Sequence, residues 1–262
     1  MILGYIGALL VGLTLGLLGG GGSILTVPIL VYLMGTNPVL ATAYSLFVVG
    51  ITSLVGAVRN MVKGMVNLKV AVVFAIPSFI AVYLTRRYLV PSIHDEIFSI
   101  GSFVLTKDLG IMVFFALIML AASYSMIKGR KEKKTEDQVK LNILLIILEG
   151  AVVGVLTGIV GAGGGFLIIP ALVLFANLPM KKAVATSLLI ISAKSLIGFL
   201  GDVQTLTIDW TFLGIFTGLS IVGIFIGIYL NNFINGKSLK KAFGWFVLVM
   251  GIYILIKELV LN

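Results

Sequence analysis

The stretch Gly16-Leu-Leu-Gly-Gly-Gly-Gly-Ser-Ile-Leu-Thr-Val-Pro28 places four consecutive glycines inside an apolar segment. It returns 142 residues later as Gly158-Ile-Val-Gly-Ala-Gly-Gly-Gly-Phe-Leu-Ile-Ile-Pro170. At the same offset and without a gap, 15 of the 41 residue pairs between positions 16 and 56 are identical. The chain is therefore an internal duplication. Two apolar halves with glycine interruptions at matching positions are typical of secondary transporters.

The composition is that of an integral membrane protein. Hydrophobic residues make up 60% of the chain, charged residues make up 11%, and the mean hydropathy is +1.19. This leaves too little polar surface to cover a soluble globule of 262 residues. Charge-free stretches such as 39–58 and 210–230 have the length of roughly 20 residues that a helix needs to cross a bilayer. We expect an all-α integral membrane protein.

Each half is predicted to contain an opening arm, a short arm after the glycine tract, and three longer spans. In the first repeat, residues 1–127, these segments are 2–18, 24–35, 39–58, 68–89 and 108–127. In the second repeat, residues 141–262, they are 141–160, 166–177, 183–201, 208–230 and 240–258. A charged stretch, residues 128–140, is predicted to be a cytoplasmic linker between the repeats.

Basic residues in the loops choose between two topologies, which differ in whether each short arm returns the chain to the side where its opening arm began. If it does, 14 basic residues lie on the linker side and four on the other side; if not, the split is 10 to 8. The positive-inside rule favours the first topology. It predicts a multi-pass protein of the inner (cytoplasmic) membrane, built as an inverted repeat of two five-segment halves, each with a glycine-interrupted helical hairpin. Whether the opening arms cross fully or form re-entrant hairpins stays open.

The two glycine tracts predict an anion site. A helical arm of about 12 residues rises about 18 Å, roughly half the hydrocarbon thickness, so we expect both tracts near the midplane and close together. A helix begins after each tract, and its unpaired amide groups and positive dipole end favour an anion. The alternative is that the glycines only permit tight helix packing. The predicted binding residues of the tracts are Gly19, Gly20, Gly21, Gly22, Ser23, Gly161, Gly163, Gly164 and Gly165.

Lys194 is the most informative single residue. It lies near the middle of the span 183–201, where a charge is costly unless it faces a partner or water, and no acidic residue lies at a clearly matching depth. An incoming anion is one candidate partner, and the carbonyl groups of a broken helix are the alternative. The hydroxyls of Ser45, Thr186 and Ser187 complete the predicted binding set.

Four polar residues matched by the repeat are expected to cap helices: Asn60 with Asp202, and Asn67 with Asp209. Arg86 and Arg87 do not fit the charge asymmetry, and we place them at the membrane edge beside an interfacial stretch.

These motifs resemble the TauE/SafE family of membrane permeases, which are called sulfite or sulfonate exporters. The resemblance rests on residues 16–28 and 41–46 and on their counterparts 158–170 and 183–188, and it covers nearly the whole chain. It implies transport of a small sulfur-containing anion, such as sulfite, a sulfonate or thiosulfate. The sequence departs from the family's usual Thr-Ser pair in the first half, where it has Tyr44-Ser45.

Two functions are consistent with these features. The first is an alternating-access anion transporter, with H+ or Na+ as the candidate coupling ion; the second is an anion channel that uses the same helix dipoles. We expect no enzyme, cofactor or metal site, because the chain has no cysteine, one histidine and no pair of acids within its spans. The expected partners are a small anionic substrate and the lipid bilayer, without nucleic acid. A homodimer is left open.

Overall fold

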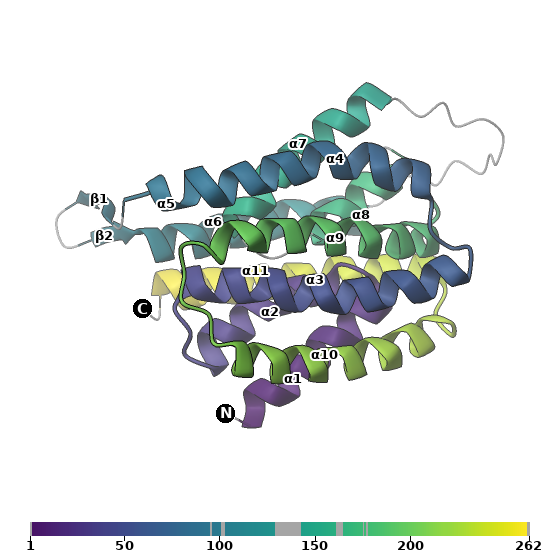
Figure 1. Cartoon of the computed structure of the whole chain (residues 1–262), viewed down its shortest axis with the longest axis horizontal. Helices are drawn as coiled ribbons and strands as arrows, with labels where there is room; N and C mark the ends of the chain where they lie inside the picture. Colours follow the sequence, from purple (N-terminus) through teal and green to yellow (C-terminus); the bar gives the residue numbers. More distant parts are fainter. Residues whose placement is uncertain are drawn as a thin grey trace.

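The computed structural model describes residues 2–94, 96–100, 103–128, 143–160, 165–174, 176 and 178–260. Nearly all of them lie in helices packed side by side in one bundle (Figure 1), so the predicted all-α class is confirmed. A two-stranded antiparallel hairpin, β1 (Glu96–Ile100) and β2 (Phe103–Thr106), projects from one end and was not predicted. Within the described ranges, four helical stretches are long and apolar enough to cross a membrane: Pro38–Val62, Leu68–Ser92, Met180–Asp202 and Trp210–Asn231.

The helices follow one another in the same order in both halves. The first half contains α1 (Ile2–Leu18), α2 (Gly21–Pro28) with the π-helical turn η1 (Ile29–Leu33), α3 (Pro38–Val62), α4 (Leu68–Leu84) with η2 (Thr85–Leu89) and α5 (Val90–Ser92), and α6 (Lys107–Lys128). The second half contains α7 (Ile143–Val160), α8 (Gly165–Leu174), α9 (Met180–Asp202), α10 (Trp210–Asn231) and α11 (Gly236–Val260).

Helices at equivalent positions in the two halves make equivalent contacts. α1 packs along α10, and its counterpart α7 packs along α4, while α3 packs on α9, α6 on α11 and α2 on α8. Glycines allow the closest of these approaches. A Cβ atom on Gly12 would lie 1.8 Å from the carbonyl oxygen of Ser220, and one on the equivalent Gly154 would lie 2.6 Å from that of the equivalent Ser78. Helices that occupy equivalent positions in the two halves therefore have equivalent packing partners.

The central helices α3 and α9 run in opposite directions. The Tyr44 hydroxyl, near the start of α3, accepts a hydrogen bond from the Asp209 N–H, in the loop after α9 (2.9 Å). The repeat-equivalent bond runs from the Asn67 N–H, in the loop after α3, to the Thr186 hydroxyl, near the start of α9 (3.0 Å). The side chains of Asn67 and Asp209 cap α4 and α10, as predicted, since each accepts a bond from the amide three residues further on.

Each short arm returns the chain towards the end where its opening arm begins. A Cβ atom on Gly4 would collide with the Met34 side chain, which follows η1, so α1 and the α2–η1 arm form a hairpin. In the second half, α7 runs alongside α4 from Gly150, packed on Phe74, to Gly158, packed beside Thr85. α7 and α9 therefore begin at the same end of the bundle, to which α8 returns the chain (Figure 1).

Candidate functional site

The two glycine-rich segments meet inside the bundle. A Cβ atom on Gly165, the first residue of α8, would lie 2.5 Å from the Gly20 Cα and 2.6 Å from the Ile191 side chain, so this approach requires glycine. Ile191 is the twelfth of the 23 residues of α9, so the contact lies half way along the central helix. Three predicted residues of the second tract lie outside the described residues: Gly161, Gly163 and Gly164.

The first tract turns the chain at Gly19. Its φ of +71° lies in the left-handed region that residues with a side chain rarely adopt, and its N–H donates to the Leu15 carbonyl (2.8 Å). α2 then begins without a side-chain cap, and its first turn contains Gly21, Gly22 and Ser23. The amide groups of this turn therefore lie at the start of a helix inside the protein, where they favour negative charge.

One face of α9 passes both glycine-rich segments. A Cβ atom on Gly19 would lie 2.9 Å from the Ser187 Oγ atom, and Ile191 contacts Gly165. Lys194 follows three residues after Ile191, and spacings of three and four residues keep these side chains on one face. The predicted residues Ser187 and Lys194 therefore share a face with the contact between the segments. Thr186 does not, because its hydroxyl bonds the loop after α3, as described above.

Lys194 is a fully buried cation, and its hydrogen-bond partner among the residues that the structure describes is a hydroxyl group. None of its side-chain surface is exposed, and its Nζ atom donates to the Thr157 Oγ1 atom (2.9 Å). Thr157 lies near the end of α7, immediately before Gly158 and the second tract. Within the described part of the chain, no carboxylate forms an ion pair with Lys194. A buried ammonium has three donors and a large desolvation penalty, so an anionic ligand at this position would stabilise it.

Buried hydroxyls without a protein partner concentrate on the two central helices. Of the five such side chains among the described residues, three lie on α3 and one on α9: Ser45, Thr52 and Ser53, and Ser195. The repeat relates Ser45 to Ser187 and Thr52 to Lys194, so the same face of each central helix is polar. Unpaired hydroxyls are costly inside an apolar bundle, and they are potential donors to a ligand. The predicted residue Ser45 belongs to this set.

A cavity of about 260 Å³ reaches from one end of the bundle to the first glycine-rich segment. We call it the basic vestibule. Its mouth carries Lys63 and Lys181, its wall includes Asn60, and its inner part is formed by Gly16 and Val184. Val184 also lies next to Gly19, since a Cβ atom built on Gly19 would lie 3.0 Å from the Val184 side chain. The lining contains two cations and no acidic residue, so its potential attracts anions.

A larger cavity of about 580 Å³ lies at the opposite end of the bundle, between the starts of α1, α3 and α10. Its walls include Tyr44 and Phe212, and its charged lining residue is Asp209, which caps α10. Its carboxylate makes this cavity less favourable for an anion than the basic vestibule, whose charged lining residues are both lysines. It is therefore a weaker candidate for the site.

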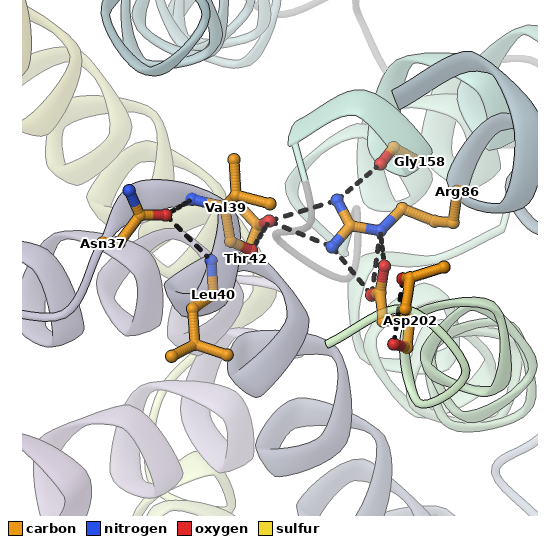
Figure 2. Close-up of polar contacts among 8 residues, drawn as sticks. Asn37, Val39, Leu40, Thr42, Arg86, Gly158 and Asp202 are labelled. Carbon is orange, nitrogen blue, oxygen red and sulfur yellow. Dashed lines mark hydrogen bonds and ion pairs between the residues drawn. The ribbon is translucent and has the colours of Figure 1, made fainter. Parts of the chain in front are cut away.

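One prediction about charged residues was wrong, because Asp202 does not cap a helix with its side chain. It forms an ion pair of 2.7 Å with Arg86, whose side chain is enclosed by protein and 1% exposed (Figure 2). The pairing had a usable signal in the sequence, because Arg86 falls within the predicted apolar segment 68–89 and an arginine at such a position needs an anion. The sequence did not reveal which carboxylate it meets.

Comparisons with known proteins agree with these features. The family model described as Sulfite exporter TauE/SafE matches residues 5–254. The chain is 32% identical over 253 residues to a probable membrane transporter protein of Xylella fastidiosa (strain 9a5c), covering 94% of this chain and 91% of that protein. It is 27% identical over 251 residues to the probable membrane transporter protein YjnA of Bacillus subtilis (strain 168), covering 93% and 95%. No solved structure matches the chain.

Proposed function

The chain belongs to the sulfite exporter TauE/SafE family, and from this premise we propose that it carries a small sulfur-containing anion across the cytoplasmic membrane by alternating access. Family membership and the curated relatives make the protein a multi-pass membrane transporter. The class of anion, the mechanism and the membrane are the proposed part. The anion is of the sulfite, sulfonate or thiosulfate class, and H+ or Na+ is the coupling ion to test.

The observation that carries the proposal is the buried ammonium of Lys194 beside the junction of the two glycine-rich segments. Among the described residues, the ammonium group donates a hydrogen bond to the neutral Thr157 hydroxyl. The helices α2 and α8 both begin at this junction. A cation enclosed by protein is strongly stabilised when an anion neutralises it, and two helix starts add favourable partial charge. An oxyanion held by Lys194, by helix-start amides and by hydroxyls such as those of Ser45 and Ser187 accounts for these groups together.

Alternating access is supported by the relation between the halves. Equivalent helices of the two halves pack in equivalent ways, and the central helices run in opposite directions. Such a pair of halves can exchange conformations, so that a site between them opens to either side in turn. The basic vestibule lies at the end that carries Lys63 and Lys181, which the positive-inside rule assigns to the cytoplasm. We therefore describe this conformation as open towards the cytoplasm.

The test is a flux assay in proteoliposomes with radiolabelled sulfite, thiosulfate and a short sulfonate, with and without proton and sodium gradients. We expect saturable flux of at least one anion. Lys194→Met should abolish it, while Lys69→Met, at an exposed lysine at the start of α4, should leave it unchanged. Wild-type flux by Lys194→Met in a folded protein would remove this lysine from the mechanism.

The same assay separates the carrier from the anion channel. A carrier gives flux that saturates with substrate and accelerates when the opposite side contains exchangeable anion. A channel gives flux proportional to the electrochemical gradient without such exchange. The vestibule favours the carrier, because a channel needs a continuous pore. The residues that line the vestibule reach inwards to Gly16 and Val184 and include none from the other end of the bundle.

A further inference from the structure

The basic vestibule has a counterpart at the other end of the bundle, where the repeat places different side chains. The repeat offset of 142 residues assigns each residue of its inner wall an equivalent residue in the other half. Gly16, Asn60, Val184 and Ile228 of the vestibule correspond in this way to Gly158, Asp202, Thr42 and Arg86. The vestibule is a cavity of about 260 Å³, whereas a single guanidinium group joins all the counterpart residues.

The guanidinium of Arg86 bonds to the other three counterpart residues, and all three of its nitrogen atoms donate hydrogen bonds (Figure 2). Its Nε atom donates to both carboxylate oxygens of Asp202 (3.0 Å each), and one terminal nitrogen donates to the same carboxylate (2.7 Å). The two terminal nitrogens also donate to the Thr42 hydroxyl (3.0 and 3.1 Å), and one of them donates to the Gly158 carbonyl (3.2 Å). The group therefore links η2, α3, α7 and α9 at one point.

We infer that Arg86 and Asp202 form the closed gate of a second vestibule, which opens to the side opposite the basic vestibule. This inference rests on the proposed carrier function. In a carrier with two equivalent halves, the same four positions line the path on each side, and the open side here has uncharged residues at Asn60 and Ile228. The ion pair at Asp202 and Arg86 closes the other side and biases the protein towards the conformation described.

Opening the gate separates the guanidinium from the carboxylate as water enters. Arg86 then presents a planar fork of donors, and such a fork binds carboxylates and other oxyanions in the same bidentate way. An oxyanion on this side can therefore take the place of the Asp202 carboxylate on Arg86. The Asp202 carboxylate therefore competes with the substrate oxyanion for the guanidinium of Arg86.

The chain has no cysteine, so a single introduced thiol can report on each side. Ala185 lines the basic vestibule, and its buried counterpart Ala43 lies next to Thr42.

The key variant combines Arg86→Ile with Asp202→Asn, which gives the closed side the residue types of the open side. It removes both charges together, so neither is left unpaired in the interior. The assay is the rate at which a membrane-impermeant thiol reagent, applied to sealed vesicles of each orientation, modifies Ala43→Cys or Ala185→Cys.

We expect the double variant to raise the labelling rate of Ala43→Cys from the outer side about tenfold, which corresponds to a bias of about 1.4 kcal/mol between conformations. The converse variant, Asn60→Asp with Ile228→Arg, should slow the labelling of Ala185→Cys from the cytoplasmic side by a similar factor. Arg87→Ile is the matched control, because this neighbouring arginine bonds the exposed Gln204 instead. It should change neither rate.

The outcomes separate a gate from a structural ion pair. If Ala43→Cys is labelled equally slowly in the folded double variant, the gate is refuted. If that variant does not fold, the converse variant decides: unchanged labelling of Ala185→Cys also refutes the gate. Labelling requires no substrate, so the expected rates together with no flux of any sulfur anion would support the gate and refute the proposed substrate class.

Discussion

Replacement of Gly165 by alanine tests the contact between the two glycine-rich segments with the smallest change available. The new Cβ atom would lie 2.5 Å from the Gly20 Cα and 2.6 Å from the Ile191 Cδ1 atom, whereas real Cβ atoms almost never come within 3.0 Å of another heavy atom. The isoleucine side chain can rotate away, but the Gly20 backbone can move only if the first segment shifts. Overpacking of this kind costs about 1 to 3 kcal/mol of folding free energy, and we expect Gly165→Ala to fall in this range.

Gly218→Ala is the matched control. Gly218 lies in the helical interior of α10, and a Cβ atom there would have no neighbour within 4 Å. Alanine forms helices better than glycine, so this variant should be as stable as wild type or more stable by up to about 1 kcal/mol. The assay is thermal unfolding in detergent together with anion flux in proteoliposomes. Equal melting temperatures and equal flux for Gly165→Ala and Gly218→Ala would refute the close approach of the two segments.

Three further predictions concern charge and capping. Asp202→Ala leaves Arg86 buried without an anion, so it should destabilise the protein by about 3 to 5 kcal/mol, and the double variant with both charges removed should be more stable than this single variant in thermal unfolding. Asn67→Ala removes the cap of α4 and should cost about 1 kcal/mol, measured in the same way. Lys63→Gln with Lys181→Gln should slow anion flux at low ionic strength, and the difference from wild type should shrink as salt screens the vestibule.

The local features of the fold could be predicted because they depend on residues close together in the chain. Helices long enough to cross a membrane follow from uninterrupted apolar runs, and the caps at Asn67 and Asp209 follow from polar residues directly before such runs. The β1–β2 hairpin escaped prediction, because β1 begins within residues 91–98, the stretch expected to be interfacial.

The partners of the buried charges could not be predicted in the same way. Arg86 and Asp202 lie 116 residues apart, and their pairing requires η2 to pack against the end of α9. Likewise, the sequence marks Lys194 as a charge that needs a partner, but Thr157 becomes that partner only because the end of α7 lies beside α9. A charge inside an apolar segment signals that a partner exists, whereas its identity depends on which helices are neighbours.

The sequence by itself determined that the protein is an all-α membrane protein built from a duplicated half, since hydropathy and an exact internal offset need no coordinates. Only the tertiary structure decided that the same four repeat positions surround a cavity at one end and an ion pair at the other. The physical reason is that two similar halves pack against each other in equivalent ways, so a few side-chain differences determine whether these four positions line a cavity or hold an ion pair.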